Sequence, residues 1–229
     1  MNLLRTIYRP LVRHAARGAF VGRNRSRNRP ECGRFTLGEV DEFVREAWRR
    51  VERMAANLPK EPTVGSRMNV MLACLSFSML TVFLERGVER QYAVELIADA
   101  AWRVYQKWAI LPNVFARLLT RSAAKRMEVC VNAFLRFPFN PPGYQFERAP
   151  SDCGIAFNIV GCPIARYLQK QDAADLCVAS WCNLDFALAE MWGGKLERTG
   201  TLAEGRQQCD FHFKAARCVN QRLPGGAMT

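Results

Sequence analysis

The chain of 229 residues has only two histidines and lacks the common motifs of nucleotide-binding and hydrolytic sites. It contains no G-x-G-x-x-G, no Walker loop, no G-x-S-x-G and no H-E-x-x-H. Kinases, Rossmann dehydrogenases, serine hydrolases of the elbow type and zincins are therefore poor interpretations. No apolar signal-peptide core precedes a small-residue cleavage site, which predicts a cytoplasmic protein.

The net charge of +12 is concentrated at the N-terminus, because residues 1–34 hold nine arginines and a single acid, Glu31. The remaining chain is only weakly basic and has no nucleic-acid recognition module, so we expect no nucleic-acid partner. Residues 1–20 have two interpretations. One is a basic amphipathic helix that contacts an anionic membrane surface or an acidic partner. The favoured one is a loosely packed tail that Pro10 interrupts or kinks. Residues 1–35 are taken as a basic segment and linker, and 36–229 as a single domain.

The first half of this domain is predicted to be helical. Thr36 and Glu39 fit a capping box before apolar residues at helical spacing. The most apolar run, 68–84, is expected to be a core helix, since it is short for a membrane span and carries polar residues. Further helices are expected over 89–110 and 112–134.

The second half changes from helix to strand after a proline-rich turn at 137–142. A helix is expected to begin after Cys162, and another over 173–192. Short strands are predicted over residues 144–148, 154–160, 195–202 and 208–214. The expected fold is α+β, with a helical N-terminal half packed on a small, mostly antiparallel sheet.

Nine cysteines are a high and odd number, and in the cytosol we expect them to be reduced. Six of them follow residue 150 without any C-x-x-C pair: Cys153, Cys162, Cys177, Cys182, Cys209 and Cys218. A zinc or iron–sulfur site is an alternative that this spacing does not support, and no cofactor is expected.

Cys162 and Cys182 are the candidate nucleophiles. Pro163 places Cys162 near a helix N-cap, where free amides favour a thiolate; a buried structural thiol is an equal alternative. Cys182 and Asp185 lie three residues apart on one helix face, as a nucleophile with its acid or base would. The residues alone favour a structural Asp185 bonded to backbone amides or to Arg198.

The last predicted strand places Cys209 on the same face as two phenylalanines, on the core side or at the floor of a pocket. Asp210 and His212 lie on the opposite face and could pair as acid and base. An exposed strand-end histidine is the favoured alternative.

In four ordered elements the chain resembles the L-2-amino-thiazoline-4-carboxylic acid hydrolase family: Cys162-Pro163, Cys182-Asn-Leu-Asp185, Arg198-Thr-Gly-Thr201-Leu-Ala-Glu-Gly205 and Cys209-Asp210-Phe211. Gly65 and Asn69, followed by an apolar helix and Gly87, also look like the N-terminal half of this family. The resemblance covers roughly 36–214.

The resemblance implies opening of a cyclic isothiourea amino acid to an N-carbamoyl-cysteine. Cys162 or Cys182 would attack carbon 2 of the ring, or activated water would. Asp185 would handle protons or bind the amidine, and Arg198 would bind the substrate carboxylate. Further candidates for substrate binding are Asn69, Cys209, Asp210 and His212.

The C-terminal motif also resembles, distantly, small-molecule-binding domains of vinyl-reductase type. Zinc-binding versions of that domain carry their ligands at positions that fall on Arg198 and Thr201 here, which argues against a zinc site. The alternative function is therefore a non-catalytic small-molecule sensor with a closed apolar pocket.

Trp102, Trp108 and Phe115 are candidates for a homodimer surface or for the core.

Overall fold

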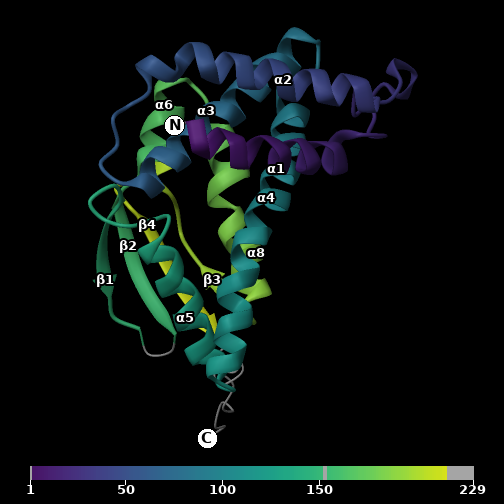
Figure 1. Cartoon of the computed structure of the whole chain (residues 1–229). Coiled ribbons are helices and arrows are strands. Elements are labelled where there is room, and N and C mark those ends of the chain that lie inside the picture. The colour runs from purple at the N-terminus through teal and green to yellow at the C-terminus, as the bar shows by residue number, and fades with distance from the viewer. Residues whose placement is uncertain (1, 152–153, 216–229) are drawn as a thin grey trace, which may run out of the picture.

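A computed structural model describes residues 2–151 and 154–215 and shows a helical half beside a small sheet (Figure 1). Cys153 and Cys218 therefore lie outside the described residues. The α-helices are α1 (Asn2–Phe20), α2 (Leu37–Met54), α3 (Val64–Glu85), α4 (Arg90–Leu119), α5 (Ala123–Arg136), α6 (Pro163–Lys170), α7 (Ala174–Cys177) and α8 (Leu184–Met191). The short turns are η1 (Pro30–Cys32), η2 (Ala55–Asn57), η3 (Val178–Cys182) and η4 (Leu202–Glu204).

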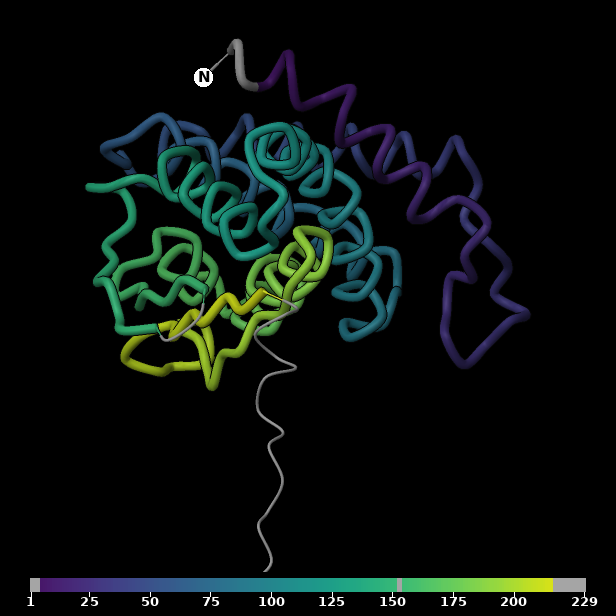
Figure 2. The backbone as a smooth tube through the Cα atoms, turned by 90° about the horizontal axis from the view of Figure 1, so that it is seen from below, coloured from purple at the N-terminus to yellow at the C-terminus, as the bar shows by residue number. Residues whose placement is uncertain are grey.

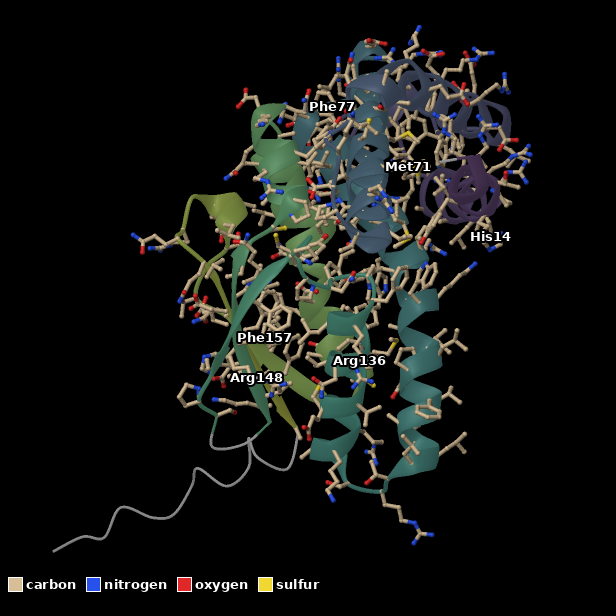
Figure 3. All side chains as sticks on the ribbon, turned by 60° about the vertical axis from the view of Figure 1, so that its left-hand side comes forward. His14, Met71, Phe77, Arg136, Arg148 and Phe157 are labelled. Atoms are coloured by element: carbon tan, nitrogen blue, oxygen red, sulfur yellow. The ribbon has the colours of Figure 1, made fainter. Side chains whose placement is uncertain are left out.

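Four antiparallel strands form one sheet in the order β1-β2-β4-β3, which confirms the α+β prediction. They are β1 (Gln145–Ala149), β2 (Ile155–Gly161), β3 (Gly194–Glu197) and β4 (Cys209–Ala215). Phe157 of β2 lies opposite Phe211 of β4, and their rings stack with centroids 5.1 Å apart. Figure 3 shows Phe157 pointing from the sheet toward the helices. This aromatic face packs against α5 and α8, so the sheet buries one side.

Helix α3 is the central helix of the larger core, as its apolar sequence predicted. It packs against α2, α4 and α6. By length and composition it could cross a membrane, with mean hydropathy 1.7, yet 67% of that window is buried inside the protein. The capping box before α2 is also confirmed, because the Glu39 amide donates to Thr36 Oγ1 and Glu39 accepts from the Thr36 amide.

Helix α1 is packed into the core rather than held as a loose tail. Tyr8 and Phe20 are 1% exposed and belong to the same buried cluster as α2 and α3. The helix continues through Pro10 and packs along α4 and α2, on the side of the molecule away from the sheet (Figure 2). On its outer side His14 is exposed (Figure 3).

The arginines of the N-terminal segment pair with acids of the helical body. Arg13 and Arg17 both donate to Asp41 of α2, at 2.5 and 2.6 Å. These two guanidinium groups hold the pKa of Asp41 well below its usual range. Further pairs are Arg9 with Glu52, Arg23 with Asp99, Arg25 with Glu39 and Arg27 with Glu95.

Two helix boundaries differ from those predicted. Helix α4 does not break at Pro112 but continues to Leu119, where Thr120 ends it. Proline removes one backbone donor, and packing against α5 and α8 keeps the helix intact around it. The nearby Ala109 carbonyl also accepts a bond from the Trp192 indole at 3.5 Å. The helix predicted over 173–192 is divided into α7, the π-helical turn η3 and α8.

Replacing Gly65 with alanine is expected to destabilise the fold by about 1–3 kcal/mol, because a new Cβ there would overpack a filled site. It would lie 2.2 Å from the carbonyl oxygen of Pro138. Gly38, in the first turn of α2, is the matched control, since a Cβ there meets nothing within 4 Å. Gly38→Ala should stabilise by about 0.5 kcal/mol through helix propensity. Chemical denaturation measures both, and equal stability of the two variants would contradict the packing.

Candidate active site

Four thiols converge where the sheet meets the helices, and we call Cys162, Cys177, Cys182 and Cys209 the thiol cluster. They come from the end of β2, from α7, from η3 and from β4. Each of the other three acts electrostatically on Cys177, so the four sulfurs share one region. Among residues 2–151 and 154–215, no three His, Cys, Asp or Glu side chains are arranged to hold a metal ion.

Cys162 is the N-cap of α6, as its place before Pro163 predicted. Its sulfur accepts a bond from the Ala165 amide at 3.5 Å. Burial nevertheless raises the pKa of this thiol to about 12, because the amide bond only partly offsets desolvation. Arg166 does not face the sulfur but pairs with Glu61 at 3.3 Å. The local environment therefore keeps Cys162 as a neutral thiol.

The surroundings of Cys182 lower the pKa of its thiol, whereas those of Cys162 raise it. Cys182 lies at the end of η3, five residues after Cys177, and the wider π-helical turn brings the two side chains together. The bond from the Cys177 thiol lowers the pKa of Cys182, and this effect outweighs burial and the nearby charge of Asp185, which raise it. The Arg198 guanidinium and the Thr201 hydroxyl add smaller lowering effects. Cys177 has a raised pKa because it is the donor of this pair and is buried. Cys182 is thus the thiol of the cluster that is favoured as a thiolate.

Asp185 lies one turn after Cys182, at the start of α8, and is the carboxylate of the site. Burial raises the pKa of Asp185 to about 7, against the opposing effect of Arg198. It lines a cavity of about 60 Å³ whose remaining lining is apolar and largely aromatic. These neighbours are Val131, Phe134, Leu135, Phe139, Phe157, Ile159, Leu188, Trp192, Phe211 and Phe213. A carboxyl group in such a cavity can give and take protons near neutral pH.

Arg198 follows β3 and lies beside Asp185. Its side chain is 4% exposed and lies between the rings of Phe186 and Phe211, at 4.8 and 5.4 Å from their centroids. Its Nη1 donates to the Cys182 carbonyl at 3.0 Å and lies 3.5 Å from Asp185 Oδ2. The expected contact between Arg198 and Asp185 is therefore present, and it fixes the cation beside the carboxyl group.

Two tyrosines complete the site, and the sequence pattern gave no signal for either. Tyr105 of α4 is acted on electrostatically by Asp185, Cys162 and Cys182, and burial raises its pKa. Tyr144 precedes β1, and its hydroxyl accepts a bond from the Asn69 amide at 2.8 Å. Cys162 and Cys177 act electrostatically on Tyr144, so Asn69 holds a hydroxyl that lies near the thiol cluster. Both tyrosines are neutral hydrogen-bonding groups at ordinary pH.

The three candidates on β4 are separated by the strand's alternation. Cys209 lies on the buried face and accepts a bond from the Leu202 amide at 3.1 Å, while burial raises its pKa to about 12. Asp210 and His212 lie on the opposite face, so the structure does not bring them to the thiol cluster. Asp210 instead accepts bonds from the amides of Thr199 and Gly200 at 3.0 and 3.2 Å. It therefore holds the loop that carries Arg198.

A family model described as L-2-amino-thiazoline-4-carboxylic acid hydrolase matches residues 86–213, more than half of the chain. The chain belongs to this family. Its name implies a hydrolase, and the match includes the whole thiol cluster, Asp185 and Arg198. Asn69 and helices α1 to α3 lie outside the matched residues of this family member. Neither curated proteins nor solved structures give a match.

Alkylation of the native protein is expected to distinguish the thiols of this family member. At neutral pH iodoacetamide should modify Cys182 at least about tenfold faster than Cys162 or Cys209, because only the thiolate reacts. Exposed Cys32 gives an internal reference for an accessible thiol. Peptide mass spectrometry over time measures each rate. Faster labelling of Cys162 than of Cys182 would contradict the electrostatics described above.

Proposed function

We propose that this chain hydrolyses a cyclic isothiourea amino acid of the 2-amino-thiazoline-4-carboxylate type to an N-carbamoyl-cysteine. One observation carries the proposal. A carboxyl group with a pKa of about 7, Asp185, lies one helical turn from a thiol with a lowered pKa, Cys182, and both adjoin Arg198. This arrangement offers a nucleophile, a proton donor and a carboxylate-binding cation in one buried place.

In the first step, the Cys182 thiolate adds to carbon 2 of the ring and forms a carbon–sulfur bond. The bond between carbon 2 and the ring sulfur then breaks, and the ring sulfur leaves as a thiolate. Protonated Asp185 gives it a proton, which leaves a free substrate thiol and an ionised Asp185. The substrate is now joined to Cys182 as an open-chain isothiourea.

In the second step, a water molecule attacks the same carbon, and the carboxylate of Asp185 accepts its proton. The bond between that carbon and Cys182 breaks, so Cys182 returns as a thiolate. The product rearranges its protons to the urea form of N-carbamoyl-cysteine. One water is consumed, and both side chains finish in the states in which they began.

Arg198 is the group proposed to hold the substrate carboxylate. Its guanidinium is fixed by the Cys182 carbonyl, by Asn183 at 3.4 Å and by two aromatic rings. A planar guanidinium held in this way suits paired hydrogen bonds to a carboxylate. Its charge also stabilises the thiolate of Cys182. Cys162 and Cys209 have high thiol pKa values, and neither forms a covalent bond with the substrate in this mechanism.

The proposal is tested by incubating the full chain with 2-amino-thiazoline-4-carboxylate. We expect one thiol to appear per N-carbamoyl-cysteine formed, followed with a thiol reagent and by mass spectrometry. Acid quenching during turnover should trap a species heavier than the protein by one substrate molecule, attached to Cys182. Substrate binding without product would contradict the proposal and favour the non-catalytic sensor.

A further inference from the structure

A second cavity, of about 90 Å³, lies among α1, α3, α4 and η3 and is not used by the reaction above. Its walls are almost wholly apolar. Representative lining residues are Val12 of α1, Leu72 of α3, Val104 and Trp108 of α4, and Trp181 of η3. A cavity of this kind between helices is the usual form of a site for the apolar part of a small molecule.

The polar groups of this lining offer little to a ligand. The indole nitrogen Nε1 of Trp181 makes no hydrogen bond to any of the described residues, but it is fully buried and so does not face the cavity. The Ser180 hydroxyl donates to the Leu176 carbonyl, and the side-chain amide of Asn69 donates to Tyr144. The lining is therefore suited to an uncharged apolar group.

The cavity adjoins the candidate active site through shared residues. Tyr105 lines it, and Asp185 and Cys182 both act electrostatically on Tyr105. Leu184 lines the second cavity, while its neighbour Asp185 lines the aromatic one. Phe134 borders both. A molecule held at Asp185 is thus close to the second cavity.

Two of the walls lie outside the residues that define the family match. Helices α1 and α3 end before residue 86, where the match begins. The reacting groups lie inside the match, as does α4, which forms another wall of the cavity. The walls from α1 and α3 are suited to select a part of the substrate that the ring-opening reaction does not touch.

We propose that this cavity binds an uncharged apolar substituent of the substrate, packed against the side chain of Trp181. This inference rests on the proposed function, because that function supplies the substrate. A cavity of roughly 150 Å³ holds benzene, and this one is about 90 Å³. The substituent is accordingly short, with about three or four carbon atoms.

The first test uses butan-2-one, an uncharged molecule of four carbon atoms, on the full chain labelled with ¹⁵N-tryptophan. The indole signal of Trp181, assigned from a Trp181→Phe variant, should shift saturably. Ala100→Leu fills the cavity and should weaken this binding at least about tenfold. Ala98→Leu, on the same helix but outside the lining, should leave binding unchanged. Absence of a saturable shift, or binding that survives Ala100→Leu, would overturn the inference.

The second test compares 2-amino-thiazoline-4-carboxylate with the same ring carrying a propanoyl group on its exocyclic nitrogen. The ratio of kcat/KM for the substituted over the plain ring should fall at least about tenfold in Ala100→Leu. An unchanged ratio would overturn the inference while the proposed function stands. If neither ring is turned over but butan-2-one binds as described, the proposed function fails and the cavity remains a binding site.

Discussion

Replacing Asp185 with asparagine is expected to lower kcat for ring opening by about 10²- to 10⁴-fold, the usual contribution of a general acid or base. Asparagine keeps the size of the side chain but cannot give or accept the proton in either step. Stopped assays with 2-amino-thiazoline-4-carboxylate measure the loss. Glu190→Gln, which removes an exposed carboxylate from the same helix, is the matched control and should retain wild-type turnover.

The pH dependence of the wild-type protein follows from the raised pKa of Asp185. The first step requires its protonated form, which predominates below pH 7 and is lost above it. Activity should therefore fall with a midpoint near pH 7 on the alkaline side, and it should fall on the acid side as Cys182 loses its thiolate. In Asp185→Asn the alkaline limb should disappear. If the alkaline limb persisted unchanged in this variant, it would have to arise from the titration of another group.

Cys182→Ser is expected to lower kcat by about 10³-fold or more, because a serine hydroxyl is far less nucleophilic than a thiolate and the neighbouring Asp185 is protonated when the first step begins. The acid-trapped adduct should also disappear. Turnover of the variant and the mass of the quenched protein measure both effects.

Cys162→Ser is the matched control for this substitution. Serine is a good N-cap, so it can replace the sulfur that accepts the Ala165 amide and keep α6 in place. We expect most of the activity to remain, since Cys162 is a neutral thiol in the folded protein. If the Cys162 variant were the inactive one and the Cys182 variant retained turnover, the roles given to the two thiols would be reversed.

Local signals in the sequence predicted those parts of the fold that local physics decides. The capping box of Thr36 and Glu39 and the N-cap at Cys162 involve residues three or fewer apart, so they are visible without a structure. Pro112 misled the prediction because its cost is offset by packing against residues far away in the chain. Contacts between residues far apart in the chain cannot be recognised from the neighbouring sequence alone.

The residues of the candidate site were visible in the sequence in the same uneven way. Cys182 and Asp185 were predicted on one face of a single helix; the structure divides that helix into η3 and α8, and Asp185 still acts electrostatically on Cys182. Cys177 was not expected beside Cys182, because a spacing of five puts two side chains on different sides of an α-helix. Only the π-helical turn brings these thiols together. Tyr105 reaches the site from a distant helix, and nothing in its sequence neighbourhood indicates this.

The pairing of the N-terminal arginines with acids of α2 and α4 changes how the charge of this protein should be understood. The net charge of +12 suggests a strongly cationic surface. Arg13 and Arg17, however, converge on Asp41, and Arg27 reaches Glu95. Much of the basic segment is consequently paired within the molecule. The net charge of the protein is unchanged by this pairing, so its affinity for polyanions depends on where the unpaired charges lie.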